Sequence, residues 1–72
     1  MVEYLVILRN GQWWMIHDGH RRGPYITQAI AIEGSLRLAK LDFKLGRSTR
    51  VSVQKDAGFE LVYDSEHPGL VQ

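Results

Sequence analysis

The dipeptide Asn10-Gly11, which separates two apolar runs, constrains the fold of this chain more than any other feature. A two-residue type I′ turn needs positive φ at both central positions, which asparagine tolerates and glycine adopts freely. The dipeptide therefore predicts a β-hairpin in which Arg9 pairs with Gln12. The other pairs in this register are Leu8 with Trp13, Ile7 with Trp14, Val6 with Met15, Leu5 with Ile16 and Tyr4 with His17.

The predicted hairpin has two faces, and both are more apolar than a water-exposed surface should be, because side chains alternate between the faces of a strand. The first face has Glu3 at its end and otherwise carries Leu5, Ile7, Trp14 and Ile16. The second face carries Tyr4, Val6, Leu8, Trp13, Met15 and His17. We expect the first face to pack against a helix and the second to make dimer or ligand contacts.

A helix is predicted over about residues 28–45. Thr27 is a suitable N-cap, because its hydroxyl can accept a hydrogen bond from an unpaired amide of the first turn, and Gly46 suits the left-handed position after the last turn. Apolar residues form two stripes at helical spacing. The stripe expected to face the sheet contains Ala29, Ile32, Leu36, Ala39 and Phe43. The opposite stripe contains Ile30, Leu38, Leu41 and Leu45, together with Gly34.

Two further strands are expected after the helix. Residues 49–54 alternate apolar and polar side chains, and residues 59–63 place Phe59, Leu61 and Tyr63 on one side, with a turn at 55–58 between the two strands. We expect Val51 and Val53 to join the core beneath the helix. Gly34 in the middle of the helix is either tolerated or marks the close approach of a partner backbone.

The predicted fold is therefore α+β, with the order β-β-α-β-β. A small antiparallel sheet of two hairpins carries one helix packed across one face, in a single compact domain over residues 1–66. Residues 67–72 contain Pro68-Gly69 and are expected to be frayed.

Length and composition limit the possible functions. A chain of 72 residues without cysteine has room for one small core and no disulfide bonds, so self-association is a reasonable source of stability. The net charge of +1 argues against a dedicated nucleic-acid-binding protein, although residues 37–55 are basic and the residues from 56 onward are acidic. These charges form either solvated faces or a basic patch for phosphates. The first residues lack a basic leader, which predicts a strand in a cytoplasmic protein.

The segment from Trp14 to Lys40 contains a series of short motifs. A Trp-x-hydrophobic strand precedes a loop with a glycine and an arginine, and then a helix that begins Thr-x-x-x-Ala and contains Leu-Ala. The matching residues are Trp14, Ile16, Gly19, Arg21 or Arg22, Thr27, Ala29, Ala31, Ile32, Glu33, Leu38, Ala39 and Lys40. In these motifs the chain resembles the small bacterial proteins known as domain of unknown function 2188.

This resemblance covers a little over a third of the chain. The stretch "FELVYD" is similar to the family's closing strand, but the Asp-Gly turn that usually follows is replaced by "SEHPGL". The family is uncharacterised, so the resemblance implies a compact β-β-α-β-β domain of bacterial or phage origin and assigns no functional residue.

No catalytic, cofactor or metal site is expected from the motifs. His17, Asp18 and His20 have the side chains of metal ligands, but a strand end and a glycine-containing loop do not fix their separation. No serine has a histidine and a carboxylate at a recognisable spacing, and no phosphate-binding loop is present. We therefore expect a protein that is not an enzyme and has no cofactor.

Surplus apolar surface is the main functional clue. Burying the four aliphatic residues of the second helix stripe offers roughly 6 to 12 kcal/mol, which is comparable with the roughly 4 to 15 kcal/mol that association costs. Since a two-fold interface uses the same surface twice, we expect a non-catalytic module that forms a homodimer or binds a protein partner. The expected interface residues are Ile30, Gly34, Leu38, Leu41, Leu45, Trp13 and Met15.

The alternative function is that of a nucleic-acid-binding module. A basic sheet edge and loop that also carry aromatic side chains can combine phosphate contacts with base stacking. The residues expected for this role are Arg9, Arg21, Arg22, Tyr4 and Trp13.

Overall fold

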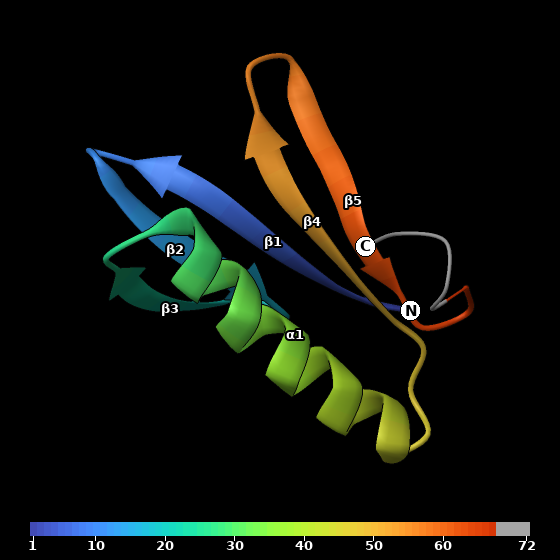
Figure 1. Ribbon diagram of the computed structural model, residues 1–72. Helices are drawn as coiled ribbons and strands as arrows, with labels where there is room; N and C mark the ends of the chain where they lie inside the picture. Colours follow the sequence, from blue (N-terminus) through green and yellow to red (C-terminus); the bar gives the residue numbers. More distant parts are fainter. Residues whose placement is uncertain (68–72) are drawn as a thin grey trace.

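The computed structural model describes residues 1–67 and shows one helix lying across a five-stranded sheet (Figure 1). Its elements are β1 (Val2–Arg9), β2 (Gln12–His17), β3 (His20–Tyr25), α1 (Gln28–Lys44), β4 (Thr49–Lys55) and β5 (Gly58–Asp64). The strand order is β3-β2-β1-β4-β5. The α+β class, with a single helix packed on one face of the sheet, is confirmed. Except for His67, the tail expected to be frayed lies outside the described residues.

Short sequence motifs predicted the first hairpin and the helix correctly. Leu5 pairs with Ile16 and Arg9 with Gln12, in the predicted register. The hydroxyl of Thr27 accepts a hydrogen bond from the backbone N–H of Ile30 at 3.1 Å, which caps the start of α1. These features depend on residues close together in the chain, so the sequence pattern is sufficient to predict them.

The sheet differs from the prediction in two ways. Residues expected to link the first hairpin to the helix form β3, which pairs antiparallel with β2. Asp18 and Gly19 connect these strands with φ of 53° and 76°, the same values as at Asn10 and Gly11, so the chain has a second turn of the hairpin type. In addition, β1 and β4 are parallel, so the sheet is mixed and not antiparallel.

The face of the first hairpin that packs against α1 is the opposite of the predicted one. Buried side chains beneath the helix come from β1, β2 and β4 and are Tyr4, Val6, Met15, Val51 and Val53. Alternation assigns residues to two faces but does not say which face the helix covers. Because β1 and β4 are parallel, the hand of the connection between them decides this.

The helix also presents a different stripe to the sheet. Its fully buried residues, Ala31, Ser35 and Ala39, are all small. Small side chains let α1 approach the sheet closely, and the hydroxyl of Thr49 on β4 donates to the carbonyl of Ala39 at 3.1 Å. The predicted stripe is wrong at its ends, since Ala29 and Phe43 are exposed.

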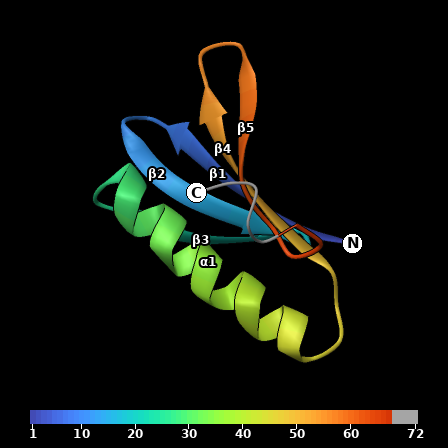
Figure 2. The ribbon, with the colours of Figure 1, turned by 45° about the vertical axis from the view of Figure 1, so that its right-hand side comes forward.

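A bulge in the last hairpin changes which side chains share a face. The register shifts between Val51 and Ser52, so Tyr63 lies opposite Val51 while Leu61 lies opposite Ser52. The prediction that Leu61 and Tyr63 lie on one side is therefore wrong. The β4–β5 turn stands clear of α1 in both ribbon views (Figure 2).

Candidate functional site

The sheet face turned away from α1 carries an apolar surface, which we call the open face. Its apolar side chains come from β1, β2 and β5 and are Leu5, Ile7, Trp14, Ile16, Phe59 and Leu61. Between β1 and β5, the strand β4 adds the polar side chains of Arg50, Ser52 and Gln54 to this face. Phe59 is 53% exposed and Leu61 38% exposed. Because α1, the one helix of the described residues, lies on the other side of the sheet, no helix covers this face.

Charged side chains lie only at the margins of the open face. The guanidinium carbon of Arg21, on the edge strand β3, lies 4.6 Å from the ring centroid of Trp14, a cation–π contact. At the end where β1 and β4 begin, Arg50 approaches Glu3 at 3.3 Å and Asp64 at 3.9 Å. Within residues 1–67, the middle of the open face therefore presents apolar side chains and the neutral polar Ser52 and Gln54, without an unpaired charge.

The outer surface of α1 holds only part of the interface predicted from the sequence. Ile30, Leu41 and Leu45 are exposed there, whereas Leu38 is half-buried and packs against the core. Gly34 faces Tyr25 of the same chain, because a Cβ atom at Gly34 would lie 3.6 Å from the Tyr25 hydroxyl. The group that approaches Gly34 closely is thus the Tyr25 side chain of the same chain and not the backbone of a partner.

A shallow groove on α1 combines apolar and basic residues. It has a volume of about 390 Å³ and is lined by Arg37, Leu38, Lys40, Leu41 and Lys44. Arg37 pairs weakly with Glu33 at 3.9 Å, and the ammonium group of Lys40 lies 5.8 Å from the ring centroid of Tyr63. The groove is therefore positively charged around its apolar floor.

Two other predicted interface residues lie under the helix. Met15 is 0% exposed and belongs to the core cluster around Tyr4. Trp13 is half-buried and packs against the core beneath the start of α1. The expectation that the face bearing Met15 and Trp13 meets a partner is wrong, because α1 covers that face.

The residues predicted for nucleic-acid binding are not gathered on one surface. Tyr4 is 1% exposed, so no base can stack on it. Arg21 and Arg22 point to opposite faces of the sheet, since Arg21 lies over Trp14 and Arg22 is the cross-strand partner of Met15.

Tyr4 forms a polar cluster with groups near the C-terminal end of α1. Its hydroxyl donates to the Asp42 carboxylate at 2.5 Å, and its ring stacks on His17 with 4.5 Å between centroids. Burial raises the pKa of Tyr4, and its hydrogen bond to Asp42 and the negative charge of that group act in the same direction, against the positive charges of Arg47 and Arg22. The hydroxyl is therefore a stable proton donor and not a base.

The two histidines considered as metal ligands are placed together by the β2–β3 hairpin. His17 and His20 are direct cross-strand partners with 6.5 Å between ring centroids, so the expectation that nothing fixes their separation is wrong. The Nδ1 atom of His17 is buried without a hydrogen-bond partner. Within residues 1–67, no three histidine, aspartate or glutamate side chains form a group able to hold a metal ion.

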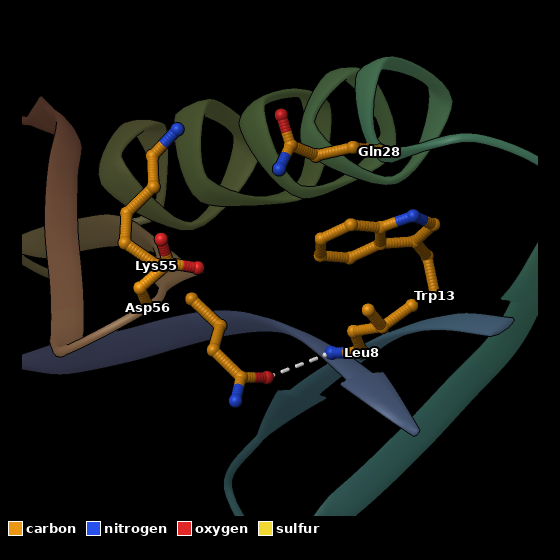
Figure 3. A pocket seen from close by; sticks show the side chains of 6 residues that line it. Leu8, Trp13, Gln28, Lys55 and Asp56 are labelled. Carbon is orange, nitrogen blue, oxygen red and sulfur yellow. Dashed lines mark hydrogen bonds between the residues drawn. The ribbon is translucent and has the colours of Figure 1, made fainter. Parts of the chain in front are cut away.

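A pocket of about 470 Å³ opens between the start of α1 and the β4–β5 turn, and we call it the Trp13 pocket (Figure 3). Its lining residues are Leu8, Trp13, Gln28, Gln54, Lys55 and Asp56. Trp13 and Leu8 stand at one end, Lys55 and Asp56 stand at the other, and Gln28 projects from the first turn of α1 (Figure 3). The pocket thus has an aromatic wall, amide groups and two opposite charges.

Hydrogen bonds tie the pocket to the end of β1. The side-chain carbonyl of Gln54 accepts from the backbone N–H of Leu8 at 2.8 Å. A guanidinium nitrogen of Arg9 donates to the carbonyl of Leu8 at 3.0 Å. Of the residues predicted for nucleic-acid binding, Trp13 lines the pocket, whereas Arg9 follows Leu8 in β1 and alternates to the other face of the sheet.

Sequence reasoning missed most residues of the pocket and the whole of the open face, because it assigned Leu5, Ile7, Trp14 and Ile16 to the core and gave no interface role to Phe59 and Leu61. Gln28, Gln54, Lys55 and Asp56 carry no motif, and they meet only because β1 and β4 are neighbours. Asp18-Gly19 is a signal that was available, because this dipeptide favours the same turn as Asn10-Gly11 and would have revealed β3.

Comparison of the chain with known protein families, curated proteins and solved structures found no match. The resemblance to domain of unknown function 2188 stays a prediction. Among the described residues, no helix has the length and apolar character needed to cross a bilayer.

Proposed function

We propose that this protein is a non-catalytic interaction module that forms a homodimer through the open face. The observation that carries the proposal is the apolar side chains on this sheet surface, with Leu5 and Ile7 on the central strand β1, Trp14 and Ile16 on β2, and the exposed Phe59 and Leu61 on the edge strand β5. Exposed apolar patches of this kind are typical of interaction surfaces. The proposal assigns no cofactor and no catalytic residue.

The size of the open face suits a small interface. Five strands about 4.8 Å apart, each about seven residues long at roughly 3.3 Å per residue, give a face of about 550 Å². Two copies would bury about 1,100 Å² in total, at the lower end of the range for specific protein interfaces. We therefore expect a dimer that dissociates in the micromolar range.

The distribution of charge favours the open face over the outer surface of α1. A two-fold interface brings the same residues of both copies together. An interface centred on the α1 groove would place Arg37, Lys40 and Lys44 near their own copies, and like charges repel. At the open face, the marginal residue Arg50 is already paired with Glu3 and Asp64.

A bacterial origin and a cytoplasmic location belong to the same proposal. The first is supported by the resemblance described above. Nucleic-acid binding, the alternative function, is supported by one observation, the position of Trp13 and Lys55 in the lining of the Trp13 pocket.

Sedimentation velocity over a micromolar concentration series tests the proposal. We expect the wild type to associate reversibly and the double variant Phe59→Ser/Leu61→Ser to dissociate at least tenfold more readily, because both residues lie on the open face. The matched control is Leu41→Ser/Leu45→Ser, which removes exposed apolar residues from α1 and should leave the dimer intact.

Circular dichroism of both variants is the control for folding, and we expect both to remain folded. A wild type that stays monomeric at every concentration contradicts homodimerisation. A dimer that is lost in the α1 variant and retained in the β5 variant places the interface on the helix, and contradicts the assignment to the open face.

A further inference from the structure

We propose that the Trp13 pocket binds a nucleobase, either of a free nucleotide or of single-stranded nucleic acid. Its volume of about 470 Å³ falls within the roughly 300 to 1,000 Å³ that is typical of small-molecule sites. The pocket lies on the α1 side of the sheet, so it stays accessible when the open face is covered by a second copy. The inference is therefore independent of homodimerisation.

The indole of Trp13 provides a rigid stacking wall. One part of the side chain packs against the core cluster of Val6, Ala31 and Val53, and another part lines the pocket. Leu8 adds an exposed apolar surface beside it (Figure 3). A wall that is held by the core loses little freedom when a planar ring stacks on it, and nucleobases stack on aromatic side chains whatever their sequence.

Polar groups around the wall match the edge of a base. The carbonyl of Gln54 is occupied by the Leu8 N–H, which fixes this side chain and leaves its amide group free to donate two hydrogen bonds. Gln28 offers both a donor and an acceptor, and Asp56 offers acceptors. Within residues 1–67, neither of these two side chains has a hydrogen-bond or ion-pair partner, so both are available to a ligand.

One cation lies where a phosphate attached to the base could reach it, because Lys55 lines the pocket. The ammonium group of Lys55 pairs with Glu60 at 3.3 Å, but both side chains are exposed, and such pairs are weak. A phosphate can therefore compete for Lys55.

A nucleobase satisfies these groups better than an aromatic side chain does. A phenyl ring would stack on Trp13 but would leave Gln28, Gln54 and Asp56 without partners, whereas a base carries N–H and carbonyl or ring-nitrogen groups at its edge. The attached phosphate adds the contact with Lys55.

Nuclear magnetic resonance of the two indole N–H groups tests the inference with a control inside the chain. AMP, GMP, UMP and a short single-stranded DNA of mixed sequence are titrated at low salt, with ribose 5-phosphate as the ligand that lacks a base. We expect the Trp13 resonance to shift and that of Trp14, on the open face, to stay in place. A response to the mononucleotides identifies a free nucleotide as the ligand. A salt-dependent response to the DNA alone identifies single-stranded nucleic acid as the ligand.

The variants Trp13→Leu, Gln28→Ala and Asp56→Ala should each weaken binding at least tenfold, and the last two alter side chains outside the core. Phe59→Ser/Leu61→Ser should bind as the wild type does, which separates this result from that of the dimer test. The inference is overturned if ribose 5-phosphate gives the same shift as AMP, if Trp13 and Trp14 shift equally, or if neither the mononucleotides nor the DNA shift Trp13 at millimolar concentration.

Discussion

The hydroxyl of Tyr4 joins the central strand of the sheet to the last turns of α1, with a short hydrogen bond to Asp42 and a longer one to the Leu38 carbonyl at 3.5 Å. We predict that Tyr4→Phe lowers the free energy of unfolding by about 1 to 3 kcal/mol at neutral pH, because the carboxylate loses its donor. Urea denaturation measures this difference. Tyr63→Phe is the matched control, since Tyr63 is half-buried on β5 and its hydroxyl has no hydrogen bond within residues 1–67.

The same hydrogen bond gives stability a pH dependence. Burial and Asp42 raise the pKa of Tyr4 in the folded state above the value of about 10 in an unfolded chain. The folded state therefore holds this proton more tightly, and the resulting contribution to stability is complete below about pH 10 and is lost as the pH rises further. The difference between wild type and Tyr4→Phe should shrink above about pH 10; a difference that stays constant there contradicts the role given to the buried hydroxyl.

Gly23 is a position where the backbone excludes a side chain. Its φ is 126°, and a Cβ atom would lie 3.1 Å from the Trp13 carbonyl oxygen and 3.2 Å from the Trp14 ring. We predict that Gly23→Ala lowers the free energy of unfolding by more than about 2 kcal/mol, because strain and a clash add together. Gly19→Ala is the control, since φ is also positive there but nothing lies within 4 Å of the Cβ position.

Thermal unfolding followed by circular dichroism compares the two glycine variants. Gly19→Ala should cost only about 1 kcal/mol, the strain of a left-handed alanine. Equal destabilisation by both variants would mean that there is room for a Cβ atom at Gly23, and would contradict the packing of β3 against Trp14.

The secondary-structure elements differ in how far local sequence determines them. The Asn10-Gly11 turn and the Thr27 cap are interactions between near neighbours, so both were predicted. The face of the sheet that α1 covers depends on the connection between two parallel strands, which alternation along one strand cannot reveal. The Trp13 pocket was not predictable for the same reason, because its residues come from several elements.

The contact between α1 and the sheet depends on small side chains at four-residue spacing. We predict that Ala39→Leu destabilises the fold by about 1 to 3 kcal/mol, because the larger side chain must push α1 away from β4, where Thr49 donates to the Ala39 carbonyl. Ala29→Leu, on the exposed side of α1, should change stability by less than about 0.5 kcal/mol. Chemical denaturation distinguishes them, and an Ala39→Leu variant as stable as Ala29→Leu would show that the helix is not closely packed.

At the scale of the whole molecule, the two faces of the sheet have different roles. One face is closed by α1 and holds the core, with the Trp13 pocket at the end where α1 begins. The other face carries the apolar side chains of the open face, and within residues 1–67 no helix lies over it. A second copy would cover the open face, so that both faces of the sheet would be packed, as is usual for sheets in larger folds.

Isotope-filtered nuclear magnetic resonance on an equimolar mixture of labelled and unlabelled chains tests this arrangement most directly. We predict contacts between the Trp14 ring of one protomer and methyl groups of the open face of its partner, namely those of Leu5, Ile16 or Leu61. Contacts from Leu41 or Leu45 in their place, or no contacts between protomers at concentrations well above the micromolar range, would contradict a homodimer formed through the open face.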